Sequence, residues 1–114
     1  MKVLVCGGRD FNNYKLLEDT LNKWLIPSST DIIISGLARG ADTLGVQYAN
    51  AHNIQVMSFP ALWNTYGKSA GYRRNEQMLI EGKPDLVIAF QGGKGTQHMI
   101  DISKSANITV KQIE

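Results

Sequence analysis

The chain has 114 residues, of which 43% are hydrophobic and 19% charged, and its formal net charge is +2. This length predicts one domain, residues 1–114, that can bury a core without disulfides, and Cys6, the only cysteine, excludes an internal disulfide and a thiolate zinc cluster. So small a charge does not by itself indicate a nucleic-acid binder, and no apolar run approaches the roughly 18 residues of a membrane span.

The first half of the chain alternates strand-like and helix-like segments. Val3–Cys6 and Asp31–Ile34 are short, β-branched and nearly continuously apolar, which is typical of strands covered on both faces. The helix expected after each strand is marked by an apolar stripe with helical spacing, and the first stripe stops before Pro27. The stripes are Leu17, Leu21, Trp24 and Leu25, then Ala41, Leu44, Tyr48 and Ala51.

The second half continues this alternation. A helix from about residue 71 to 81 is closed by Gly82 and Pro84, and a last helix spans about 96 to 106. Each helix leads into a strand, so the order predicts the α/β class, with a Rossmann-like, doubly wound parallel sheet of about five strands and helices on both faces. The remaining predicted strands are Ile54–Phe59, Leu86–Phe90 and Ile108–Ile113.

Nine of the eleven glycines and all the arginines fall in the strand-to-helix connections or at the helix starts that follow them. In a parallel sheet these connections emerge at one edge, where open α/β sheets bind ligands. Glycine lets backbone N–H groups approach an anion, helix amino ends add partial positive charge, and arginine donors suit phosphate. The sequence therefore predicts a phosphate-binding edge.

The candidate ligand-binding residues come from four connections. The third connection, 60–75, is the longest and suggests a partly mobile lid, in which Trp63 and Tyr66 either stack on a base or pack onto the sheet. In the fourth, three glycines lead into a helix expected to be capped by Thr96. The candidates are Gly7, Gly8, Arg9 and Asp10; Gly36, Arg39, Gly40 and Asp42; Pro60, Trp63, Lys68, Arg74 and Asn75; and Gly92, Gly93, Lys94, Gly95 and Thr96.

Two standard nucleotide motifs are absent. The segment 7–11 is not G-x-G-x-x-G, and Ser35 ends the second strand where a dinucleotide-binding fold would place an acidic residue. The segment 92–96 is not an NTPase phosphate loop, because Lys94 is followed by glycine.

Several single residues keep two interpretations. Asp42 is either a first-turn carboxylate stabilised by the helix dipole or a group that bonds ribose hydroxyls or tethers Arg39. Cys6 is expected to be a small core residue, with a reactive thiol as its alternative, whereas His52 is expected to end a helix and His98 to lie in a first turn that could face the site. No histidine or carboxylate partner has metal-ligand spacing, so we expect no metal and no cofactor.

The chain resembles the SLOG superfamily, specifically its YspA/YpsA-related branch, over nearly its whole length. The resemblance implies a Rossmann-like fold that binds nucleotide-derived ligands, and the family is thought to include sensors of nucleotide signals or of NAD and ADP-ribose derivatives. The matching segments are 7–11 (GGRDF), 36–42 (GLARGAD), 59–61 (FPA) with Trp63, 67–71 (GKSAG) running to Arg74-Asn75, 84–87 (PDLV) and 92–96 (GGKGT).

The same resemblance sets out the alternatives. LOG-type phosphoribohydrolases carry PGGxGTxxE with a catalytic glutamate, whereas here Gln91 replaces the proline and Met99 stands at the glutamate position. Methionine performs no acid–base chemistry, so hydrolysis would need a substitute carboxylate, of which Asp10, Asp42 and Asp101 are the nearest.

The leading hypothesis is therefore a module that senses or sequesters a nucleotide, ADP-ribose or a related signal. A nucleotide hydrolase is the first alternative. The second is a single-stranded nucleic-acid binder like the DNA-processing protein A family, which the single basic cluster disfavours. We expect a cytoplasmic protein with a small-molecule partner and no membrane partner, and a homodimer or higher homo-oligomer would be compatible.

Overall fold

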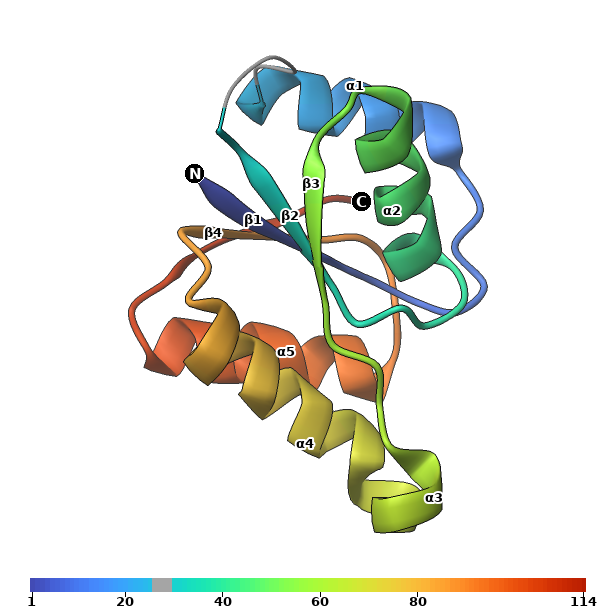
Figure 1. Ribbon diagram of the computed structural model, residues 1–114, viewed down its shortest axis with the longest axis vertical. Helices are drawn as coiled ribbons and strands as arrows, with labels where there is room; N and C mark the ends of the chain where they lie inside the picture. The colour runs from blue at the N-terminus through green and yellow to red at the C-terminus, as the bar shows by residue number, and fades with distance from the viewer. Residues whose placement is uncertain (26–29) are drawn as a thin grey trace.

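Five parallel strands form one sheet in the order β3-β2-β1-β4-β5 in the computed structural model, which describes residues 1–25 and 30–114 (Figure 1). The register pairs Leu4 of β1 with Ile34 of β2 and with Val87 of β4. This parallel sheet with its helices confirms the predicted fold class. The strands are β1 Lys2–Cys6, β2 Ile32–Ser35, β3 Gln55–Ser58, β4 Leu86–Ala89 and β5 Thr109–Gln112.

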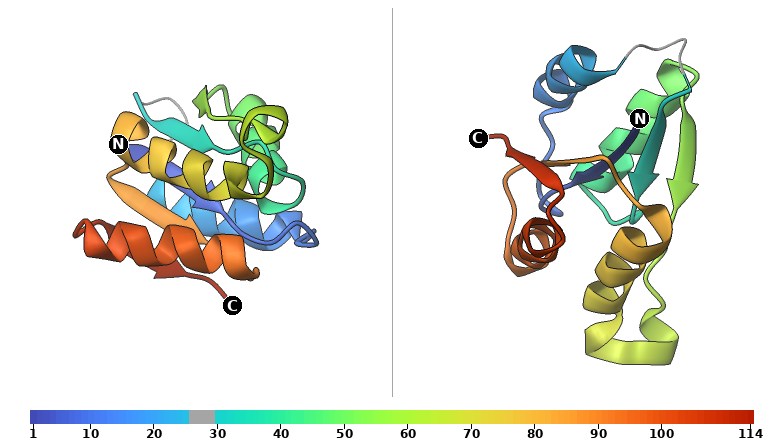
Figure 2. Two further views of the ribbon diagram at one scale, coloured as in Figure 1. Left: turned by 90° about the horizontal axis from the view of Figure 1, so that it is seen from below. Right: turned by 90° about the vertical axis from the view of Figure 1, so that its left-hand side faces the viewer.

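Helices cover both faces of the sheet (Figures 1 and 2). The 3-10 turn Gly67–Ser69 precedes α4 and the π-helical turn Met78–Gly82 follows it, so 67–82 is one continuous helical segment. The stop expected at Pro27 lies outside the described residues. The helices are α1 Tyr14–Trp24, α2 Ala41–Ala51, α3 Trp63–Tyr66, α4 Ala70–Gln77 and α5 Lys94–Ser105.

Alternation along β1 builds the two halves of the core. Val3 and Val5 pack in the cluster that includes Leu17 of α1 and Tyr48 of α2. Their neighbours Leu4 and Cys6 pack on the other side, in a cluster with Met78, Met99 and Ile100. The end of β1 therefore carries Cys6 toward the face that α4 and α5 cover.

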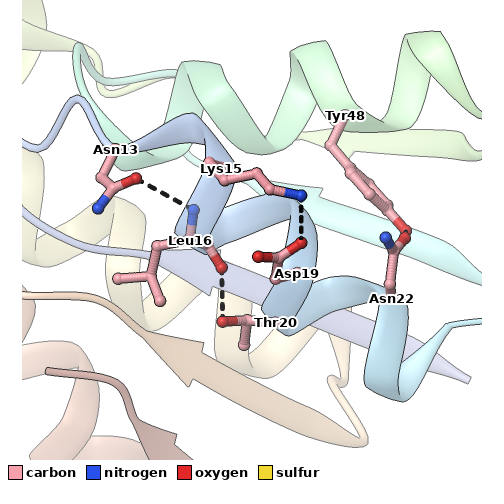
Figure 3. A network of polar contacts seen from close by, with 7 residues as sticks. All are labelled: Asn13, Lys15, Leu16, Asp19, Thr20, Asn22 and Tyr48. Atoms are coloured by element: carbon pink, nitrogen blue, oxygen red, sulfur yellow. Dashed lines mark hydrogen bonds and ion pairs between the residues drawn. The ribbon is translucent and has the colours of Figure 1, made fainter.

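Polar contacts organise α1 and attach it to α2 (Figure 3). The Asn13 side chain accepts a hydrogen bond from the Leu16 N–H at 3.1 Å and so caps the start of α1. The Tyr48 hydroxyl of α2 donates to Oδ1 of Asn22 in α1 at 2.6 Å. These contacts fix the start of α1 at the end of the connection that follows β1, and they join the two helices of this layer.

Two expectations need correction. The strands were expected to be covered on both faces, but the two edge strands, β3 and β5, have only exposed and half-buried residues, so the helices cover the edges of the sheet less completely than its centre. The third connection was expected to be a long loop, yet most of it is helical: α3 begins at Trp63 and is followed by the 3-10 turn and α4. A free connection of this length would leave many backbone groups without intrachain partners, and helical turns satisfy them.

Candidate ligand-binding site

A pocket of about 400 Å³ opens where the carboxyl end of β1 meets the amino ends of α4 and α5. The strand order reverses between β1 and β4, which is the position where open α/β sheets bind ligands. We call this cavity the main pocket. Its lining residues are Cys6, Gly7, Gly8, Arg9, Ala38, Asp42, Trp63, Lys68, Gly71, Tyr72, Arg74, Asn75, Met78, Gly93, Lys94, Gly95, Thr96 and Met99.

The main pocket brings together twelve of the eighteen sequence candidates. Three others, Gly36, Arg39 and Pro60, line an adjoining cavity of about 520 Å³, which we call the second hollow. Asp10, Gly40 and Gly92 line neither cavity.

Arg74 lines both cavities as a half-buried cation. Its Nη1 donates to the Gly36 carbonyl at 2.7 Å, and its Nε donates to Oδ1 of Asn75 at 3.1 Å. Among the described residues no carboxylate lies within ion-pair distance of it. Burial lowers the pKa of Arg74, against the opposing effect of Asp42, yet arginine remains charged at neutral pH. The site thus holds a fixed positive charge that no carboxylate neutralises directly.

Asn75 joins α4 to the start of α5. Its Nδ2 donates to the Gly95 carbonyl at 3.1 Å and lies 3.2 Å from Nδ1 of His98. His98, expected as a group that could face the site, does not line the main pocket and packs edge-on against Tyr72. His98 therefore contacts Asn75, and Asn75 in turn accepts the hydrogen bond from Arg74.

Asp42 is buried at the start of α2, and its Oδ2 accepts a hydrogen bond from the Ala38 N–H at 3.2 Å. Burial raises the pKa of Asp42 to about 6, although Arg74 and the Ala38 N–H act in the opposite direction. Asp42 does not tether Arg39, as one interpretation had it. Arg39 instead contacts Asp10 at 3.4 Å and donates to the Arg9 carbonyl at 3.2 Å.

The glycines of the edge divide into two groups. A Cβ on Gly40 would overlap the backbone of Gly8, and a Cβ on Gly92 would overlap the Thr96 side chain and the Gly8 N. These glycines therefore let the connections pack closely on one another. Gly93 and Gly95, in contrast, have no atom within 4 Å of a built Cβ, and both line the main pocket. The space beside them is open to a ligand.

The helix α5 begins earlier than expected. Lys94 is its first residue and Gly93 its N-cap, with no side-chain hydrogen bond at the cap. Thr96 is not the cap, because it lies inside the helix, whereas a capping residue has a non-helical backbone. The amino end of α5 consequently presents uncapped N–H groups and partial positive charge at the main pocket.

The sequence matches the family model described as "YspA, cpYpsA-related SLOG family" over residues 1–66, more than half of the chain. The chain belongs to this SLOG family. No curated protein and no solved structure matches it. Membership suggests nucleotide-related binding or processing. The matched residues include Arg9, Arg39 and Trp63, while Arg74 and the start of α5 lie beyond them.

In this SLOG chain the main pocket has methionine, and not glutamate, at the position of the LOG catalytic residue. Met99, at the LOG glutamate position, is 1% exposed and lines the floor with Cys6. Burial raises the pKa of the Cys6 thiol far above its usual range, so it stays protonated. Of the substitute carboxylates, Asp42 lines the pocket, whereas Asp101 bonds Gln97 on the surface and Asp10 is fully exposed.

The rim of the SLOG pocket is aromatic and basic. Trp63 is 47% exposed, and the Arg9 guanidinium lies 5.5 Å from its ring centroid. Tyr72 lines the same pocket, whereas Tyr66 contacts Arg73 outside it.

Six residues that line the main pocket were not among the sequence candidates: Cys6, Ala38, Gly71, Tyr72, Met78 and Met99. Of these, Gly71 and Met78 lie on the same helical segment as the candidates Arg74 and Asn75. The signal that could have found them is helical spacing, because residues 71, 74, 75 and 78 share one face of a helix. Within 1–25 and 30–114, no group of histidine, cysteine and acidic residues is placed to hold a metal ion. No helix in these ranges has the length and apolarity to cross a bilayer.

Proposed function

We propose that the chain binds a nucleotide or nucleotide-derived phosphate ester, a class that includes ADP-ribose, in the main pocket, and that it senses or sequesters this ligand rather than hydrolysing it. Four cations line the pocket, Arg9, Lys68, Arg74 and Lys94, against one acidic residue among its described lining residues, Asp42. The balance of charge favours an anion.

The observation that carries the proposal is the environment of Arg74. Its Nε and Nη1 are fixed by Asn75 and by the Gly36 carbonyl, and no described carboxylate pairs with it. Keeping a half-buried guanidinium without an ion pair costs stability, and an anionic ligand offsets that cost. The uncapped start of α5 lines the same pocket and offers backbone N–H groups to the same anion.

The remaining lining residues suit the rest of a nucleotide. With phosphate between Arg74 and the amides near Gly95, the half-exposed Trp63 and Tyr72 offer ring faces for a base at the rim. Asp42 offers a carboxyl group for ribose hydroxyls. The proposal assigns no role in bond cleavage to Met99 or Cys6.

The proposal is tested by a pair of adjacent variants, Arg74→Gln and Arg73→Gln, which change the net charge equally. Arg73 contacts Tyr66 and does not line the main pocket, so it serves as the control. We expect Arg74→Gln to weaken nucleotide binding in calorimetry by about tenfold or more, as the loss of a charged hydrogen bond does, and Arg73→Gln to stay within about twofold. Equal affinities for the two variants would refute the site.

Hydrolysis is checked in the same samples. After prolonged incubation, chromatography of nucleoside monophosphates should show no free base and no ribose phosphate. Turnover that is lost in Asp42→Asn would replace the binding proposal with the hydrolase alternative.

A further inference from the structure

The second hollow, like the main pocket, is lined by an excess of cations. Three arginines line it, Arg9, Arg39 and Arg74, and none of its described lining residues is acidic. Its other lining residues are Gly36, Leu37, Ala38, Pro60, Ala61 and Trp63. A phosphate group carries at most two negative charges, so one phosphate in the main pocket would leave at least one of these three arginines without a phosphate partner.

The two cavities share a wall. Arg9, Ala38, Trp63 and Arg74 line both of them. The Arg74 Nη1 donates to the Gly36 carbonyl beside the second hollow, while its Nη2 lies 4.0 Å from the position that a Cβ on Gly71, a lining residue of the main pocket, would take. One guanidinium therefore faces two sites, and groups bound in them would be close neighbours along a ligand.

The connection that forms the second hollow is held in an unusual shape. Leu37 has φ of 60°, a conformation that a branched side chain disfavours. Hydrogen bonds from the Leu37 N–H to Oγ of Ser35, at 3.1 Å, and from the Ala38 N–H to Asp42 hold it there. A Cβ at Gly36 would overlap the Arg74 guanidinium, so the glycine is what admits the arginine. Strain of this kind gathers at ligand sites.

We infer that the second hollow is an anion subsite for a second phosphate adjacent to the first, so that the ligand is a nucleotide derivative carrying a pyrophosphate group. The inference rests on the proposed function and adds the class of ligand to it. The first phosphate lies at the start of α5, the second between Arg39 and Arg9, and Arg74 contacts both.

The Arg39 guanidinium of the second hollow is paired with the carboxylate of Asp10. The two side chains are 75% and 99% exposed and 3.4 Å apart, so their attraction is weak and screened. A phosphate with more charge and fixed neighbours displaces Asp10. Asp10 therefore acts as a competitor, and its removal favours the ligand.

The experiment uses the simplest probes, inorganic phosphate and pyrophosphate, titrated into isotope-labelled protein and followed by amide chemical shifts. Phosphate is expected to shift the amides of Gly93 and Gly95. Pyrophosphate is expected to shift these and also the amides of Leu37 and Arg39. Pyrophosphate shifts confined to 93–96 would overturn the second subsite alone, and no shift from either probe would overturn the proposed function as well.

Variants sharpen the result. Arg39→Gln is expected to lower pyrophosphate affinity about threefold to tenfold and to leave phosphate affinity unchanged, whereas Asp10→Asn is expected to raise pyrophosphate affinity up to about fivefold. Arg73→Gln, which changes the charge outside both cavities, is the control. A drop in Arg39→Gln that is equal for the two probes, or matched by Arg73→Gln, would reduce the effect to general electrostatics and overturn the subsite.

Discussion

Arg74 and Asp42 bring opposite charges to one pocket without forming an ion pair among the described residues. Burial acts on each in the direction that disfavours its charge, lowering the pKa of Arg74 and raising that of Asp42 to about 6. The mutual attraction only partly offsets these effects. Such perturbed groups in a cleft are typical of functional sites.

The raised pKa of Asp42 makes stability depend on pH. Its pKa in the folded protein, about 6, lies above the ordinary value of 3.8, so the folded state binds more protons between these values and loses stability as pH rises through them. The free energy of unfolding falls by an amount on the order of 3 kcal/mol, because a pKa difference of one pH unit corresponds to about 1.36 kcal/mol. Asp42→Asn should escape it, gaining about 2–3 kcal/mol over the wild type between pH 4 and pH 7 in urea unfolding. If the unfolding free energies of the wild type and of Asp42→Asn changed with pH in parallel, the pKa of Asp42 would not be raised by folding and the prediction would be wrong.

Sequence alone predicted the residue types of the site better than their contacts. The glycines and arginines gather at one edge because topology places every strand-to-helix connection there. The sequence could not predict which carboxylate contacts Arg39. Asp10 does so and Asp42 instead accepts from the neighbouring Ala38 N–H, a difference that depends on side-chain geometry. The burial that raises the pKa of Asp42 is likewise a tertiary property.

At the scale of elements, the site is made by connections packed on one another. The Gly8 N–H donates to the Gln91 carbonyl at 2.9 Å, and the Phe11 and Ala41 N–H groups both reach the Gly8 carbonyl. The connection after β1 thereby touches those after β2 and β4. These hydrogen bonds join the three connections to one another, and Gly93 and Gly95, which have open space beside them, lie at the start of α5 in the last of the three.

Two glycines of the same connection should respond to alanine with opposite signs. Gly95→Ala adds a methyl group in open space within a helix and should stabilise the protein by about 0.5–1 kcal/mol. Gly92→Ala drives a methyl group into Thr96 and the Gly8 backbone and should cost about 1–3 kcal/mol. Urea unfolding measures both effects.

The stabilised variant also reports on the ligand. If the space beside Gly95 receives phosphate, Gly95→Ala should bind inorganic phosphate several-fold more weakly despite its greater stability. Wild-type phosphate affinity in Gly95→Ala would place the anion elsewhere in the pocket.

For the whole molecule, alternating strands and helices were sufficient to predict the parallel α/β fold, because apolar runs and helix stops are local signals. Which strands lie at the edges was not predictable, since β3 and β5 differ little in pattern from the others until the strand order is known. The helical start of the third connection was also missed. The exposed stretch 61–68, which contains Trp63 and Tyr66, has no regular apolar stripe to mark a helix.

The distribution of charge over the whole molecule distinguishes a small-ligand binder from a single-strand binder. The site cations gather around two adjoining cavities, while others are engaged elsewhere: Lys15 pairs with Asp19, and Lys111 lies over Trp24. A strand needs a continuous basic track, and each phosphate contact adds about 0.7 to the slope of log affinity against log salt. Fluorescence anisotropy with thymidine oligomers of increasing length should therefore show weak affinity that does not grow with length. Free pyrophosphate should displace whatever binds. Affinity that rises with length and a steep salt slope would establish the single-strand alternative instead.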